Sequence, residues 1–81
     1  MTQESILFHD SIRNNISFGD ESIDEEKIIE SAKVANAYKF INSLEDKFDT
    51  VIGERGLKLS GGQRQRICIA RAIYKLSLIH I

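Results

Sequence analysis

The residues best suited to chemistry are Ser60, Gly61, Gly62 and Gln63, which begin the last amphipathic segment of the chain. Ser and Gln three residues apart have the spacing of a capping box, which predicts that a helix begins here. A helix N-terminus carries unpaired N–H groups and a partial positive charge, and glycines leave that backbone open to an anion. The pattern therefore predicts a phosphate contact. The alternative is a Ser-capped helix that tolerates two glycines.

The remaining residue types offer less chemistry. Cys68 lies in an apolar stretch with no histidine nearby, so we expect a small apolar core side chain rather than a catalytic thiol. His9 and His80 are assigned to neither catalysis nor a metal. A basic helix face, either solvated or helping to hold phosphates, is predicted to comprise Arg64, Arg66 and Arg71.

Three helical regions are predicted to position these residues. Capping residues and apolar spacing place them at about residues 11–17, at 24–44 with a break near Asn36, and at 61–74. In the middle region Ser22 and Asp24 are rival N-caps. Two apolar stripes are expected to be buried, one of Ile28, Ala32 and Ala35, the other of Val34, Tyr38 and Ile41. The expected fold is mainly α-helical.

Length and composition limit the possible classes of protein. The chain has 81 residues, a formal net charge of −1, 42% hydrophobic residues and 28% charged residues, as in one folded domain. Because the charges nearly balance, no field attracts a polyanion, and no nucleic-acid partner is expected. No apolar run has the length of a membrane span. One cysteine excludes an internal disulfide framework.

Three motifs carry a resemblance to a known family. Residues 59–72, Leu-Ser-Gly-Gly-Gln-Arg-Gln-Arg-Ile-Cys-Ile-Ala-Arg-Ala, resemble the signature segment of ATP-binding cassette (ABC) transporter nucleotide-binding domains. Gln3, followed by Phe8 and by Asn15-Ile16, resembles the Q-loop and the segment after it. Residues 50–56 resemble the X-loop of the exporter subgroup. The resemblance covers residues 1–75 and implies the helical subdomain of a P-loop α/β ATPase.

The resemblance implies a role for each motif. Two nucleotide-binding domains pair head to tail in this family, and ATP lies between them. Gln3 would lie near Mg²⁺ and the attacking water. Phe8, Glu54 and Arg55 would face the coupling helices of the membrane domains, and Arg55 and Glu54 also the partner domain. The γ-phosphate of the partner's ATP would be contacted by Ser60, Gly61, Gly62 and Gln63. Without the family, Gln3 and the Glu54–Arg55 pair would be interpreted as solvated.

Parts of the family pattern are missing. No Gly-x-x-x-x-Gly-Lys-Ser/Thr motif occurs in the chain, and no acidic pair follows Lys75. Residues 1–75 are therefore interpreted as part of an ABC nucleotide-binding domain. Residues 76–81 are interpreted as a tail outside the family pattern, from truncation or assembly, although their sequence could also be the start of a strand. The complete protein is expected to be an ATPase with ATP and Mg²⁺ as cofactors. This chain alone is expected to be inactive.

Three functions remain to be compared. The first is part of an exporter of lipids, drugs or peptides at the cytoplasmic face of the inner or plasma membrane. The second is part of a soluble ABC ATPase that acts in DNA repair or on ribosomes. The third is a freestanding helical interaction module, which only the capping interpretation of residues 60–63 would support. The Gly-Glu-Arg-Gly sequence at residues 53–56 favours the exporter.

Overall fold

A computed structural model describes residues 6–18, 20–53 and 57–79. Within these ranges the structure is helical, and the only extended pairing is one antiparallel bridge between Ser11 and Val51. The elements are α1 (Ile12–Ile16), α2 (Glu25–Val34), α3 (Tyr38–Asn42), the 3-10 helix η2 (Lys47–Asp49) and α4 (Gly61–Ser77). The expected mainly α-helical fold is thus confirmed.

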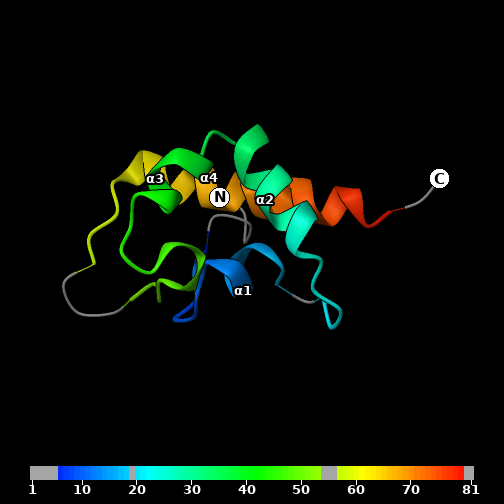
Figure 1. The fold of residues 1–81 in the computed structure, drawn as a ribbon, viewed down its shortest axis with the longest axis horizontal. Helices are drawn as coiled ribbons and strands as arrows, with labels where there is room; N and C mark the ends of the chain where they lie inside the picture. Colours follow the sequence, from blue (N-terminus) through cyan, green and yellow to red (C-terminus); the bar gives the residue numbers. More distant parts are fainter. Residues whose placement is uncertain (1–5, 19, 54–56, 80–81) are drawn as a thin grey trace.

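Helix α4 is the axis of the molecule. It runs along the long dimension of Figure 1, with α2 and α3 along its upper side and α1 below it. Both α1 and α2 contact α4 directly. The side chains with no exposed surface at these contacts are Ile12, Ile16, Ile28, Ala32, Ile67, Ala70 and Tyr74. Ile67, Ala70 and Tyr74, which share one face of α4, therefore form the centre of the core.

Short polar side chains fix where the helices begin. The Ser11 hydroxyl oxygen accepts a hydrogen bond from Asn14 N (3.0 Å) at the start of α1. At α2 the choice between the two rival caps falls on Asp24, whose carboxylate accepts from Glu26 N and Lys27 N. Each cap satisfies donors that the first helical turn leaves unpaired.

The break near Asn36 is confirmed, and its geometry corrects one expectation. α2 ends at Val34, and Asn36 adopts φ 61°, a left-handed conformation that Asn tolerates and that turns the chain into α3. Val34 comes just before this turn and is 65% exposed, so it does not belong to the buried stripe expected with Tyr38 and Ile41. Ile41, after the turn, is fully buried.

The segment that leads into α1 and the segment that follows η2 are joined by backbone hydrogen bonds. Ile12 N donates to Thr50 O (2.9 Å), and Ile52 N donates to Asp10 O (2.8 Å). The segment after the Q-loop motif and the first half of the X-loop motif therefore lie side by side. At the other end of the chain, α4 extends to Ser77, so residues 76 and 77 are helical rather than the start of a strand.

Candidate functional site

The N-terminal turn of α4, residues 60–63, has the predicted capping box. Gln63 N donates to the Ser60 hydroxyl oxygen (3.0 Å), and Ser60 N donates to Gln63 Oε1 (3.0 Å). These two bonds hold the turn rigid and fix both side chains. The groups available to bind a phosphate are therefore the hydrogen-bond donors that the capping box does not use. These are the Gly61 and Gly62 N–H groups, the Ser60 hydroxyl hydrogen and the Gln63 side-chain amide.

The two glycines of this turn have no structural need to be glycine. Neither Gly61 nor Gly62 has a positive φ, since Gly53 is the one such glycine among the described residues. A Cβ at Gly61 would meet nothing within 4 Å, and a Cβ at Gly62 would meet only the Ser60 Oγ at 3.9 Å. Both residues are exposed. The fold would therefore accept alanine at either position.

Electrostatics also favours an anion at this turn. The first turn of α2 contains Glu25 and Glu26, which offset the positive end of that helix. The first turn of α4 contains no acidic residue, and Arg64 follows directly. The positive end of a 17-residue helix is thus left to be neutralised by solvent or by a ligand.

An exposed aromatic pair, Phe8 and Phe18, forms a second surface feature. The two rings stack with centroids 4.5 Å apart and an interplanar angle of 17°. Phe8 is 39% exposed and Phe18 is 49% exposed. Sequence analysis singled out Phe8 and missed Phe18, because nothing in the local pattern indicates that residues ten positions apart stack.

Arg71 lies beneath this aromatic pair. It was expected on an exposed basic face with Arg64 and Arg66, and the structure shows that this expectation is wrong for Arg71. Arg64 and Arg66 are exposed as predicted, but Arg71 is 3% exposed and faces α1. Its guanidinium lies 5.3 Å from the Phe8 ring centroid and 5.9 Å from the Phe18 ring centroid. Burial along α4 starts only at Ile67, and α1 and α2 are the helices that contact α4. The same helix face is therefore exposed at residue 64 and buried at residue 71.

Tyr74 ties the other end of α4 to α2. Its buried hydroxyl donates to Asp20 Oδ2 (2.5 Å) and accepts from the backbone N–H of Asp24, the N-cap residue of α2 (3.1 Å). Burial raises the pKa of the Tyr74 hydroxyl, and the bond from Tyr74 lowers the pKa of Asp20. Both groups keep the protonation states that this bond needs at neutral pH.

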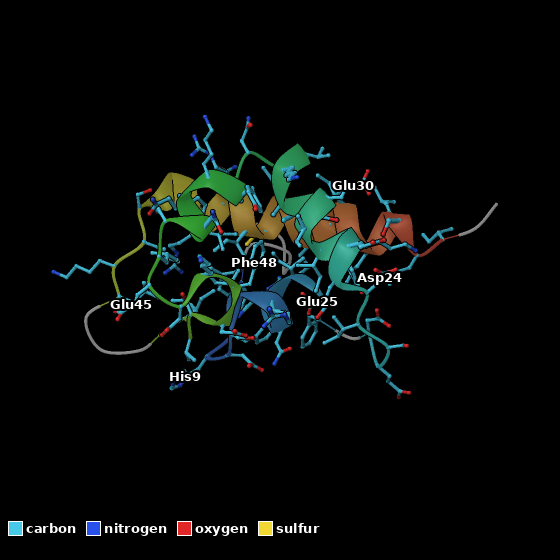
Figure 2. All side chains as sticks on the ribbon, viewed as in Figure 1. His9, Asp24, Glu25, Glu30, Glu45 and Phe48 are labelled. Carbon is cyan, nitrogen blue, oxygen red and sulfur yellow. The ribbon has the colours of Figure 1, made fainter. Side chains whose placement is uncertain are left out.

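The other candidate residues stay outside the site. Cys68 is buried and free, and burial raises the pKa of its thiol, which agrees with a core role. Figure 2 shows His9 at the edge of the molecule, away from α4, and Phe48 toward its centre. Over residues 6–18, 20–53 and 57–79, no cluster of three His, Cys, Asp or Glu side chains could hold a metal ion. In the same ranges no helix is long and apolar enough to cross a membrane.

Comparison with known proteins decides the family. The family model described as "ABC transporter" matches residues 1–81. The chain belongs to the ABC transporter family. It is 57% identical over 75 residues to the "ATP-dependent lipid A-core flippase" of Syntrophus aciditrophicus (strain SB), covering 93% of this chain and 12% of that protein.

Two further relatives extend the similarity. The protein of the same name from Coxiella burnetii is 56% identical over 82 residues, covering 100% of this chain and 14% of that protein. The "ABC transporter B family member 1" of Dictyostelium discoideum is 48% identical over 79 residues, covering 98% of this chain and 9% of that protein. The chain thus spans a small part of the length of these relatives. The resemblance to exporter-type ABC transporters is confirmed.

Some of the site residues that the family resemblance implies lie within the described part of the chain, and others lie outside it. Ser60, Gly61, Gly62 and Gln63 form one exposed turn, and Phe8 lies on the surface beside α1. Gln3, Glu54 and Arg55 lie outside the described residues. Gly53, directly before that pair, has φ 95°, and a Cβ there would lie 3.3 Å from His9 Cδ2. This glycine, unlike the two in α4, is required by the fold itself.

Proposed function

We propose that this chain is part of the ATP-binding domain of an ABC exporter, which couples ATP hydrolysis to export of a lipid, drug or peptide. In this proposal the α4 N-terminal turn contacts the γ-phosphate of ATP bound to a second nucleotide-binding domain. One observation carries the proposal. Gly61 and Gly62 lie exposed in a helical turn where the fold has room for a side chain, and helix stability favours one.

The groups of this turn fit the terminal phosphate of ATP. A triphosphate is recognised by converging neutral and cationic donors, and the turn offers backbone N–H groups, the Ser60 hydroxyl and the Gln63 amide. The capping box orients the Ser60 and Gln63 side chains before any ligand arrives. Phosphoryl transfer depends mainly on positioning and charge stabilisation, so a rigid donor surface closing on the γ-phosphate would promote it.

The rest of the nucleotide site is proposed to come from elsewhere. The chain contains no Gly-x-x-x-x-Gly-Lys-Ser/Thr motif, which cradles the phosphates in P-loop ATPases. By family resemblance Gln3 would lie near Mg²⁺ and the attacking water of the ATP bound in its own domain. Mg²⁺ would neutralise developing charge on the phosphates. We therefore expect this chain alone to lack ATPase activity.

A second surface is proposed to receive the membrane domains. Phe8 and Phe18 present an exposed aromatic pair beside α1, and Glu54 and Arg55 belong to the X-loop motif of residues 50–56. We propose that coupling helices of the membrane domains dock here, and that the Glu54–Arg55 segment also faces the partner domain. In this proposal the chain lies at the cytoplasmic face of the membrane.

A substitution in the α4 N-terminal turn tests the proposed phosphate contact. In the complete transporter, Gly62→Leu is expected to reduce ATP turnover by roughly a hundredfold, since loss of one transition-state donor has effects of this size. The dissociation constant for ATP should stay within about twofold, because the partner side of the site holds the nucleotide. Gln65→Leu, one turn further along α4 and also exposed, is the matched control. Equal losses of binding and turnover, or wild-type turnover in Gly62→Leu, would refute the contact.

A further inference from the structure

The buried arginine of α4 connects the two proposed surfaces. Arg71 is one of the few buried charged side chains among the described residues, and its guanidinium is hydrogen-bonded to Asn15 of α1. Its Nε donates to Asn15 O (2.9 Å), and its Nη2 donates to Asn15 Oδ1 (3.2 Å). Two bonds from one planar fork fix both the position and the orientation of the contact. A buried charge is retained only where such partners hold it.

Asn15 also forms hydrogen bonds with the backbone of Phe8, one of the two residues of the aromatic pair. Asn15 is 1% exposed, and its Oδ1 also accepts from Phe8 N (2.8 Å). Its Nδ2 donates to Phe8 O (3.0 Å) and to Ser11 O (2.9 Å). The same amide oxygen therefore joins the guanidinium of α4 to the backbone of Phe8. Both polar atoms of the Asn15 side chain, Oδ1 and Nδ2, are therefore hydrogen-bonded.

The guanidinium also touches the aromatic pair directly. It lies within cation–π distance of both rings, while the outer surfaces of Phe8 and Phe18 stay exposed. A segment that docks on the aromatic pair would thus press on side chains whose inner support is Arg71. Arg71 and the α4 N-terminal turn belong to one continuous helix, Gly61–Ser77, so a displacement of the helix axis at Arg71 would also displace the turn.

We propose that Arg71 is a positioning residue that transmits contact at the aromatic pair to the α4 N-terminal turn. The proposal rests on the function proposed above, in which the pair receives a membrane-domain helix and the turn closes on the γ-phosphate. Arg71 touches neither ATP nor the docked helix. It sets the orientation of the turn relative to the docking surface through Asn15 and the two rings.

The test is a double-mutant cycle on the complete transporter in lipid nanodiscs. Arg71→Lys keeps the charge but cannot form both bonds to Asn15, and Arg71→Met removes the charge. We expect kcat for ATP hydrolysis to fall about tenfold in Arg71→Met and less in Arg71→Lys, with KM for ATP within about twofold. Phe18→Ala should lower kcat by a similar factor. The double variant, Phe18→Ala with Arg71→Met, should lose no more than the larger single loss.

Lys33→Met is the matched control, because Lys33 lies in the last turn of α2 with its ammonium 5.0 Å over the Tyr38 ring rather than against the aromatic pair. It should leave kcat and KM unchanged. Multiplied losses in the double variant would overturn the proposal, as would a rise in KM that matches the fall in kcat. If Arg71→Met does not fold, Arg71→Lys with Phe18→Ala gives the same cycle.

The same preparations separate this inference from the proposed function. Wild-type turnover in Gly62→Leu would refute the phosphate contact. A loss of turnover in Gly62→Leu together with independent effects of Arg71 and Phe18 would refute only the positioning role. Melting temperatures of all variants complete the test, because a purely structural role of Arg71 would lower kcat in proportion to lost folded protein and independently of Phe18.

Discussion

Substituting alanine for the two glycines of the α4 N-terminal turn should stabilise the helix and impair the enzyme. In Gly61→Ala and Gly62→Ala the new methyl group meets nothing closer than the Ser60 Oγ at 3.9 Å, so no clash opposes the change. Alanine restricts the unfolded chain and is the better helix former, which is worth about 0.5–1 kcal/mol at each position.

The two changes together should therefore add about 1–2 kcal/mol to the free energy of unfolding. For a chain of this size, that corresponds to a rise in melting temperature of about 4–16 °C. Thermal unfolding of the 81-residue chain, followed by circular dichroism at 222 nm, measures this rise. In the complete transporter the same methyl groups would lie where the phosphate is proposed to touch the backbone. There we expect at least about tenfold slower ATP turnover.

Gly53→Ala is the control with the opposite stability effect. Gly53 has φ 95°, and its new Cβ would lie 3.3 Å from His9 Cδ2, so alanine there should destabilise the chain by about 1 kcal/mol or more. The reasoning about the α4 glycines fails if Gly61→Ala and Gly62→Ala lower the melting temperature, because the fold would then need glycine. It also fails if both variants are more stable and hydrolyse ATP at the wild-type rate.

Three further outcomes are expected. Asn15→Ala should destabilise the chain by about 2–4 kcal/mol in denaturant unfolding, because it removes the bonds to part-buried backbone groups of Phe8 and one bond of the buried Arg71 guanidinium. The exposed Asn14→Ala should cost less than about 1 kcal/mol. The Tyr74 bond lowers the pKa of Asp20 from its ordinary 3.8, so its stabilisation is complete above that value and is lost as pH falls through the lower folded value. Acid titration of stability should show this loss, and Tyr74→Phe should reduce it to the part that comes from the Ser22 N bond to Asp20. The purified 81-residue chain should release no phosphate from ATP above a protein-free blank in a colorimetric assay.

The helices could be predicted from the sequence because their signals are local. Ser11 and Ser60 cap their helices within three residues, and Ile67 and Tyr74 fall on one face through helical spacing alone. The candidate phosphate contact could be predicted for the same reason, since the capping-box spacing and the two glycines occupy four consecutive positions. Val34 was misplaced because the left-handed residue Asn36 separates α2 from α3, so one helical spacing does not run from Val34 to Tyr38 and Ile41.

The link between the two surfaces could not be predicted, because it joins distant parts of the chain. Arg71 and Asn15 are 56 positions apart, and no local pattern indicates which helix covers the end of α4. Arg64 and Arg71 are seven residues apart and share a face by helical spacing, so the sequence predicts the same exposure for both. Only the position of α1 against the middle of α4 makes one exposed and the other buried.

The stabilising contacts of α4 are unevenly distributed along its length, and this unevenness supports a mechanical role. From Ile67 onward the helix is held by core side chains, by Arg71 against α1 and by Tyr74 against the start of α2. Its first turns contribute no buried side chain. A helix of 17 residues is about 25 Å long, and its first turns have no buried side chain of their own to fix them. Under the proposed positioning role of Arg71, a partner that shifts α1 or the aromatic pair would redirect the glycines of the first turn without touching them.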